Sequence, residues 1–415
     1  MSQHHYHHNL LCLLVHILRW YLLFSHCRCI ELGKLLSKPK SKLKLLKLVK
    51  NDLGDQCGII LGQAYQKNST LKKLSMNEIG SSMTAIGWTA IFKGLSSNPN
   101  CVLEEINIDS TNPRIQTTNI PRQNKPGKGV LALSKIKTLE EVNMRYNSSI
   151  TSYGWRALLS SLIKPKNSTL TSIKLDGCNI NNQAVVVLGN VLKNNSSLET
   201  LSLVGNEYIT TSGWIGFFKC LSSDNFSVAE LNLRDNNIDD ESLDAFTSSL
   251  GNNTTLKDLN LGYNEAVSCI GWHSFFDMFK IHQSALQELN LDGNNVDDAS
   301  VYSFLGASIH DSLTSLHLEE NESITAIGLR ALSTLLQRPH SRLTELYLND
   351  NGNFSHEVLI DFVFSLVGNK SLNILSLGRT NIKKRGWIAL ANVLCNKSSI
   401  DSTHDSNHTL QVSSP

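Results

Sequence analysis

The sequence has almost no excess of charge of either sign. Its 415 residues include 38 lysines and arginines and 36 aspartates and glutamates, which gives a formal net charge of +2. This balance argues neither for nor against a nucleic-acid partner, and we expect none. The nine cysteines are odd in number and scattered, so they do not form a closely spaced disulfide framework. That pattern favours a reducing compartment, and we expect a cytoplasmic protein.

Motifs of common enzyme active sites are missing from the sequence. It contains no G-x-x-x-x-G-K-[S/T] phosphate loop, no G-x-S-x-G turn, no H-E-x-x-H zinc motif and no paired C-x-x-C motifs. Acidic pairs such as Asp239-Asp240 and Asp297-Asp298 recur just before predicted helices, where carboxylates complement the helix dipole. We therefore expect no enzymatic activity, no cofactor, no metal site and no small-molecule substrate.

Long apolar runs are missing except near the start of the chain. Residues 10–24 are largely apolar, but His16 and Arg19 interrupt them, and a membrane span needs about 20 such residues. Residues 1–27 could form a signal sequence or anchor, or a cap helix, or precede an array that begins in mid-repeat, as in a fragment of a longer protein. Membrane association, secretion and anchoring thus stay open as alternatives.

One short pattern recurs along most of the chain. It reads L-x-x-L-x-L-x-x-N-x-L/I and is clearest in LETLSLVGNEYI from Leu198 and LQELNLDGNNV from Leu286. From Leu170 onward, successive copies begin 27 to 30 residues apart, and two kinds of copy alternate. Every second copy carries Gly-Trp, with tryptophan at positions 88, 155, 214, 272 and 387, except the copy from Leu313, which has Gly328-Leu329. A period of this size indicates a solenoid, in which repeats bury their apolar faces by stacking.

Each copy predicts one strand and one helix. In L-x-L the side chains alternate, so Leu201 and Leu203 should face the core and Ser202 the solvent. The asparagine that follows should bond the backbone of the neighbouring turn. Segments such as the one from Gln183 have apolar residues at helical spacing. The Gly-Trp pairs are predicted to pack between helices, with an aromatic row for a ligand as the alternative.

This alternation resembles the ribonuclease-inhibitor type of leucine-rich repeat over residues 29–410. The resemblance implies an α/β solenoid, a curved horseshoe with parallel strands on its concave face and helices on its convex face. We expect a non-repeat apolar segment at 1–27 and a repeat domain of about 12 repeats at 28–397. A loop insertion is expected at 111–128 and a degenerate partial repeat or tail at 398–415.

The resemblance implies a non-enzymatic protein–protein interaction scaffold that binds a protein on its concave face. Acidic side chains accompany the strand residues there, which favours a basic partner, with ordinary solvated strand residues as the alternative. The expected contact residues are Glu105, Glu141, Asp176, Glu230, Asn232, Asp258, Asn260, Glu288, Asn290, Asp292, His317, Glu319, Glu345 and Tyr347.

Two other functions remain open from the sequence. Ran GTPase-activating proteins share this repeat class, and the basic Arg114–Arg122 segment is the candidate element for such an activity, although the acidic tail of those proteins is missing. An extracellular receptor is the second alternative, if residues 1–27 are a signal sequence. In that case the thirteen Asn-x-Ser/Thr sequences, among them Asn68 and Asn369, would carry glycans; otherwise they are turns that end helices.

Overall fold

The structure is a computed structural model in which the chain forms two compact units. Unit 1 comprises residues 1–208 and 225–227, and unit 2 comprises residues 209–224 and 228–415. The apolar run at 10–24, the insertion at 111–128 with Arg114–Arg122, and residues 398–409 lie outside the described residues. The structure describes residues 26–39, 41–79, 82–109, 130–163, 169–222, 226–251, 253–280, 284–307, 312–338, 341–352, 354, 356–367, 369–394 and 410–413.

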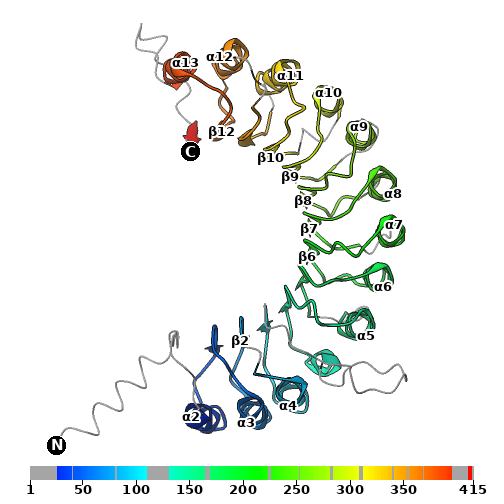
Figure 1. Cartoon of the computed structure of the whole chain (residues 1–415), viewed down its shortest axis with the longest axis vertical. Helices are drawn as coiled ribbons and strands as arrows, with labels where there is room; N and C mark the ends of the chain where they lie inside the picture. Colours follow the sequence, from blue (N-terminus) through cyan, green and yellow to red (C-terminus); the bar gives the residue numbers. More distant parts are fainter. Residues whose placement is uncertain are drawn as a thin grey trace, which may run out of the picture. The chain divides into compact units, whose positions relative to one another are not determined.

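Unit 1 alternates short parallel strands with helices (Figure 1). Each strand pairs in parallel with the next one along the chain, so the sheet follows chain order. The strands line one face of the unit and the helices the other. The strands are β1 (Leu45–Lys47), β2 (Lys73–Ser75), β3 (Glu105–Asn107), β4 (Glu141–Asn143), β5 (Ser172–Lys174) and β6 (Thr200–Ser202). The helices are α2 (His26–Leu36), α3 (Asp55–Tyr65), α4 (Ala85–Ser96), the 3-10 helix η1 (Val130–Lys135), α5 (Ser152–Leu162) and α6 (Asn182–Leu192).

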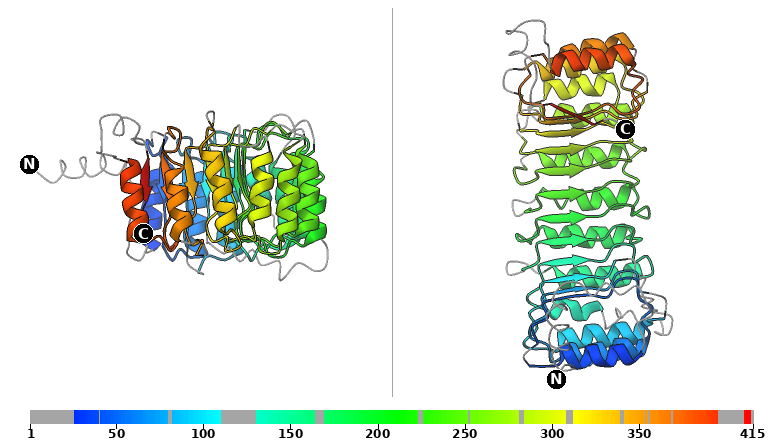
Figure 2. Two further views of the ribbon diagram at one scale, coloured as in Figure 1. Left: turned by 90° about the horizontal axis from the view of Figure 1, so that it is seen from above. Right: turned by 90° about the vertical axis from the view of Figure 1, so that its left-hand side faces the viewer.

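Unit 2 repeats the same arrangement, with its strands paired side by side in chain order (Figure 2). Its helices cover the opposite face from the strands. The strands are β7 (Glu230–Asn232), β8 (Asp258–Asn260), β9 (Glu288–Asn290), β10 (Ser315–His317), β11 (Glu345–Tyr347), β12 (Ile374–Ser376) and β13 (Gln411–Ser413). The helices are α7 (Thr211–Phe218), α8 (Asp240–Leu250), α9 (Cys269–Met278), α10 (Asp298–Gly306), α11 (Ala326–Leu336), α12 (His356–Phe364) and α13 (Lys384–Leu394).

The strand leucines form the core, as the alternation predicts. Leu201 and Leu203 are fully buried, and equivalent leucines stand opposite one another on adjacent strands, as Leu231 does with Leu259. Each repeat therefore shares its interior with the neighbouring repeats of the same unit, which is the packing of an α/β repeat solenoid. Ser202 differs from its prediction because it is 7 % exposed and donates a hydrogen bond to Asp176 at 2.5 Å.

The recurring asparagine bonds neighbouring turns, as predicted. Asn264 is fully buried, and its amide donates to the carbonyl oxygens of Leu261 in its own repeat and Leu233 in the preceding one, at 2.8 and 3.1 Å. Its own N–H donates to the side chain of Asn294 in the next repeat at 2.9 Å. This ladder supplies partners to backbone groups that water cannot reach.

The Gly-Trp pairs serve helix packing. Trp88, Trp155, Trp214 and Trp272 are at most 1 % exposed, so they cannot form a ligand row. In α9, for example, Trp272 meets Phe275 edge-on at 5.9 Å between ring centroids. The tryptophans are therefore part of the interior between helices.

The glycines before Trp88 and Trp272 each meet an aspartate of the preceding helix. In unit 1, Asp55 accepts hydrogen bonds from the N–H groups of Thr84 and Gly87 at 2.7 and 2.9 Å, and from the Thr84 hydroxyl. A Cβ atom at Gly87 would lie 2.8 Å from the Asp55 carboxylate. In unit 2, Asp240 bonds the backbone and hydroxyl of Ser268. Asp240 thus joins consecutive helices, beyond the dipole role expected from the sequence.

Two cysteines link consecutive helices. A disulfide joins Cys29 of α2 to Cys57 of α3, with 5.6 Å between their Cα atoms. Equivalent helix positions in consecutive repeats lie side by side, which brings the two cysteines together.

Two asparagines of the Asn-x-Ser/Thr sequences, Asn68 and Asn369, are buried, and each donates to a carbonyl of the preceding repeat. This supports the turn interpretation at both asparagines.

The segment expected to be a degenerate partial repeat or tail, 398–415, contains the last described strand. This strand is β13, and its Val412 pairs with Leu375 of β12. No helix among the described residues is long and apolar enough to cross a membrane.

Candidate protein-binding surface

Acidic side chains form a row across adjacent strands of unit 2. The parallel register places Glu230 opposite Asp258 and Asp258 opposite Glu288. Ser315 takes the next place in the row and Glu345 the one after it. Neighbouring strands lie about 4.8 Å apart, so successive carboxylates of the row are close neighbours. Glu230 and Glu288 are exposed, and Asp258 between them is half-buried.

The ionised form of Asp258, in the middle of the row, is disfavoured by its surroundings. Burial raises the pKa of Asp258, and the adjacent carboxylate of Glu230 raises it further, while Lys257 opposes the change. Both causes penalise the ionised form of Asp258. A positive group placed on the row would stabilise that ionised form.

A stack of two rings stands beside the row. The rings of His317 and Tyr347 lie 4.2 Å apart between centroids at an interplanar angle of 10°. The Tyr347 hydroxyl donates to Glu345 at 3.2 Å, and His317 Nε2 lies 3.8 Å from the Glu288 carboxylate. Burial lowers the pKa of His317, and the carboxylates of Glu288, Glu319 and Glu345 partly oppose that change.

The asparagines of the strand face hold the turn that follows each strand. The side-chain oxygens of Asn232, Asn260 and Asn290 accept hydrogen bonds from the N–H two residues later, at 3.0–3.1 Å. Asp292 is 5 % exposed and accepts hydrogen bonds from the Glu319 N–H and the Asn290 amide. These groups therefore have structural partners already.

Two of the three expected contact residues of unit 1, Glu105 and Asp176, lie beside cations. Lys73 forms an ion pair with Glu105 at 2.6 Å, and Glu141 stands opposite Glu105 in the register. Arg145 lies 3.8 Å from the Asp176 carboxylate, which also accepts bonds from Ser202 and the Val204 N–H. Lys73 and Arg145 thus partly offset the negative charge on the strand face of unit 1.

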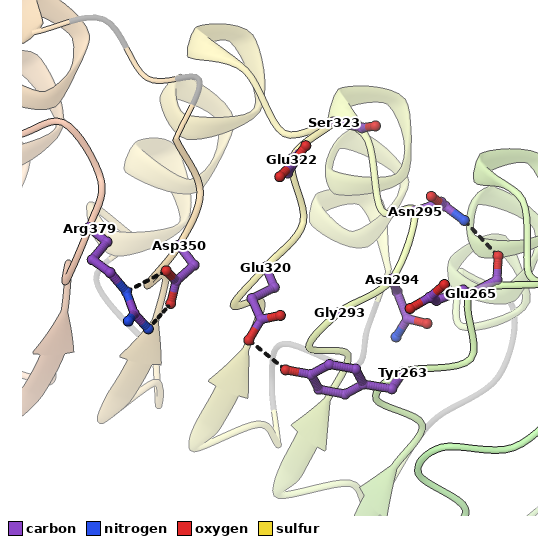
Figure 3. A pocket seen from close by; sticks show the side chains of 10 residues that line it. All are labelled: Tyr263, Glu265, Gly293, Asn294, Asn295, Glu320, Glu322, Ser323, Asp350 and Arg379. Carbon is purple, nitrogen blue, oxygen red and sulfur yellow. Dashed lines mark hydrogen bonds and ion pairs between the residues drawn. The ribbon is translucent and has the colours of Figure 1, made fainter.

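A polar pocket of about 840 Å³ lies in unit 2, where the strands turn toward their helices (Figure 3). Its lining includes Glu320, whose carboxylate accepts a hydrogen bond from the Tyr263 hydroxyl at 2.5 Å. On another rung, Arg379 forms an ion pair with Asp350 at 2.5 Å. The pocket is lined by Tyr263, Glu265, Gly293, Asn294, Asn295, Glu320, Glu322, Ser323, Asp350 and Arg379.

The pocket is acidic because four carboxylates and one guanidinium line it, which gives a formal charge of −3. Its floor depends on Gly293, which has a φ of 61° and where a Cβ atom would lie 2.7 Å from the Tyr263 ring. Arg234 lies over the same ring, 3.9 Å from its centroid. Glu319, next in sequence to Glu320, brings the pocket close to the strand face. Burial and the charge of Asp292 raise the pKa of Glu319, whose carboxylate accepts a bond from Asn349.

Comparison with known proteins identifies the repeat. A family model described as "Leucine Rich repeat" matches residues 166–189, 224–246, 252–268, 282–305 and 311–333. The chain is a leucine-rich repeat protein. Four of the five matches span a strand, a turn and part of the following helix, and the match at 252–268 contains β8 and ends just before α9.

Similar leucine-rich repeat segments occur in two curated relatives. The chain is 34 % identical over 136 residues to "Protein phosphatase 1 regulatory subunit 37 homolog" of Caenorhabditis elegans, covering 31 % of this chain and 14 % of the relative. It is 32 % identical over 151 residues to the Caenorhabditis briggsae homolog, covering 34 % and 15 %. The chain therefore spans about one seventh of each relative.

One solved structure that matches this chain is "Crystal structure of Rad7 and Elc1 complex in yeast". Its match covers 91 % of this leucine-rich repeat chain and 88 % of that chain, at 17 % identity and a TM-score of 0.45. A TM-score at this level is too low to support an argument about function.

Sequence reasoning named the strand-face carboxylates but missed the polar pocket that Glu320 and Asp350 line. The residue before each recurring asparagine adopts a positive φ, as Tyr263, Glu320 and Asp350 do. Reading that turn position from repeat to repeat gives tyrosine, glycine, glutamate, aspartate and arginine on successive rungs. The leucine-rich repeat pattern therefore contained a signal for the pocket, because this position borders it.

Proposed function

We propose that this leucine-rich repeat protein is a non-enzymatic scaffold that binds a basic segment of another protein on the strand face of unit 2. The observation that supports the proposal is the register of Glu230, Asp258 and Glu288 on three adjacent strands. Glu345 and the acidic polar pocket around Glu320 extend the same negative surface. The alternation of two kinds of repeat, with and without Gly-Trp, supports assignment to the ribonuclease-inhibitor-like class.

The mutual repulsion of the row favours a cationic partner. Two carboxylates about 4.8 Å apart repel each other by about 1 kcal/mol in bulk water and about 3 kcal/mol at an effective dielectric constant of 20. Lysine or arginine side chains laid along the row convert this repulsion into attraction. Binding of this kind weakens as the salt concentration rises, because the charges are accessible to solvent.

The size of the face favours a short segment over a broad globular surface. The five strands β7 to β11 span about 19 Å across the sheet, and five residues along a strand cover about 17 Å. The resulting area of roughly 320 Å² is well below the 800 Å² per partner of a standard interface. A partner that buries a standard area must therefore also cover the rim beside the pocket.

The test is affinity capture from the native source with the full chain as bait, followed by mass spectrometry. We expect the triple variant Glu230→Lys, Asp258→Lys and Glu288→Lys to lose the partners that the unmodified chain captures. A matched control reverses three exposed carboxylates of the helix face, with Glu241→Lys, Asp244→Lys and Asp361→Lys. Equal recovery by both triple variants would reject binding on the strand face.

A second candidate function follows from the relatives' name. We propose regulation of protein phosphatase 1 as the alternative, because both curated relatives are described as homologs of a regulatory subunit of that enzyme. The test measures retention of purified phosphatase 1 on the immobilised chain and hydrolysis of p-nitrophenyl phosphate in its presence. Neither retention nor a changed hydrolysis rate at micromolar concentrations would rule this candidate out.

A further inference from the structure

His317 is the only residue of the described strands β7 to β13 whose side chain can become positively charged. It stands next to Ser315, the one place between Glu230 and Glu345 where the acidic row has no carboxylate. Residues two apart on a strand point to the same side, so His317 faces the same surface as the row. The ring of Tyr347 on β11 stacks on its imidazole. The acidic surface of unit 2 therefore contains one titratable base.

The imidazole of His317 lies between carboxylates of both neighbouring strands. Its Nε2 atom is 3.8 Å from the carboxylate of Glu288 on β9. The same nitrogen is 3.1 Å from the Ser315 hydroxyl, which donates to Glu345 of β11 at 3.2 Å. Glu319, in the turn after β10, also favours the charged form of the imidazole. The charged groups that face this ring are thus all carboxylates.

The Glu288 carboxylate is accessible to a ligand, whereas the imidazole is mostly covered. The side chain of Glu288 is 52 % exposed and that of His317 is 19 % exposed. A ligand ammonium paired with Glu288 would lie within about 7 Å of Nε2, because an ion pair adds about 2.8 Å to the 3.8 Å between Nε2 and the carboxylate. An imidazolium at this distance repels the ammonium and competes with it for the same carboxylate.

We propose that protonation of His317 weakens the binding of the basic segment to the strand face of unit 2. This inference rests on the proposed function and specifies its regulation. A neutral imidazole leaves Glu288 to the partner, while an imidazolium pairs with Glu288 itself. Proton and partner therefore compete, and each lowers the affinity for the other by the same factor.

The sign of the pH dependence follows from this competition. Burial holds the pKa of His317 in the free protein below its usual value of about 6.5, although the surrounding carboxylates partly oppose the change. The imidazole is neutral above that pKa, so the partner binds best there. The affinity falls as the pH falls through it, and bound partner lowers the pKa of His317 further.

The test measures binding of the rhodamine-labelled peptide (Lys-Gly-Ser)₄ to the full chain by fluorescence anisotropy at low salt, from pH 7.5 to pH 5.0. Carboxylates such as Asp258 also gain protons in this range, so the unmodified chain is compared with His317→Gln. We expect the unmodified chain to lose about threefold more affinity, the repulsion between unit charges about 7 Å apart in water. The matched control is His273→Gln, which removes an exposed histidine of α9 and should follow the unmodified chain.

A second measurement reads the histidine directly. The imidazole resonance of His317 is assigned by its absence from the NMR spectrum of His317→Gln and is titrated with and without saturating peptide. The pKa of His317 should be about 0.5 lower with peptide, which corresponds to the same factor of three.

Equal loss of affinity by the unmodified chain and His317→Gln overturns the competition, as does an imidazole pKa that the peptide leaves unchanged. The proposed function fails separately if the Glu230, Asp258 and Glu288 reversal leaves the affinity at pH 7.5 unchanged. Absence of peptide binding by the unmodified chain at pH 7.5 overturns both.

Discussion

The contact between Asp298 of α10 and Gly328 of α11 should behave as one coupled unit in the stability of the protein. The Asp298 carboxylate accepts hydrogen bonds from the N–H groups of Thr325 and Gly328 at 2.8 and 2.7 Å, and from the Thr325 hydroxyl at 2.5 Å. A Cβ atom at Gly328 would lie 2.5 Å from the same carboxylate. Removing the carboxylate therefore abolishes these hydrogen bonds. It also removes the conflict between the carboxylate and a side chain placed at position 328.

The expected magnitudes follow from these three bonds and one collision. Asp298→Ala should destabilise this part of the protein by about 2–4 kcal/mol, since hydrogen bonds to charged groups contribute about 1.5–3 kcal/mol each and water replaces part of the loss. Gly328→Ala gains about 1 kcal/mol of helix propensity. Overpacking costs about 1–3 kcal/mol, so the net change is a loss of up to about 2 kcal/mol.

The double variant should be less destabilised than the sum of the single variants by about 1–2 kcal/mol. Part of the collision persists, because the Ile324 side chain would still lie 2.8 Å from the new Cβ atom. Solenoids do not reliably unfold in one step, so the measurement is hydrogen exchange of peptides covering α10 and α11 in a urea series. Additivity within about 0.5 kcal/mol would refute the coupling. As a control, Asp244→Ala and Gly328→Ala should be additive.

Three further predictions concern buried or covalent contacts. Asn264→Ala deprives the carbonyls of Leu233 and Leu261 of their amide donor and should lower the free energy of unfolding by about 3 kcal/mol. The measurement is the urea midpoint, which should fall. An unchanged midpoint would contradict the stabilising role of the asparagine ladder. Burial lowers the pKa of His317 in the folded state, so its contribution to stability is complete above the unfolded pKa of about 6.5 and is lost as the pH falls through the folded pKa. The urea midpoint should therefore fall less between pH 7.5 and 5.5 in His317→Gln than in the unmodified chain. Replacing both Cys29 and Cys57 by serine opens a link across 28 residues and should destabilise α2 by about 3 kcal/mol, seen as faster hydrogen exchange there.

The parts of the fold that were predictable are those that each repeat specifies locally. The alternation around Leu201 and the apolar spacing from Gln183 each depend on a few consecutive residues, and the structure has a strand and a helix at those places. The role of Asn264 was also predictable, because a buried turn needs a side chain that can bond backbone groups. The repeat from Leu103 differs from this pattern, because the helix described in it is the short 3-10 helix η1.

The contacts that were not predictable join residues 26 to 30 positions apart. Asp298 and Gly328 each have a local explanation, and their direct contact emerges only when the two helices lie side by side. The disulfide between Cys29 and Cys57 has the same origin. Period-two alternation also assigns a residue to a face without saying whether a neighbouring side chain covers it. Ser202 points toward the strand face and is nevertheless buried by its bond to Asp176.

This limitation applies most strongly to charge. Glu105 and Glu230 occupy the same position of their repeats and look equivalent in the sequence. The neighbour of Glu105 on β2 is Lys73, which pairs with it, whereas the neighbour of Glu230 on β8 is Asp258, which repels it. The binding capacity of a position in a solenoid is therefore decided by the residue one repeat away. For that reason we assign the basic segment to unit 2, although both units have acidic residues on their strand faces.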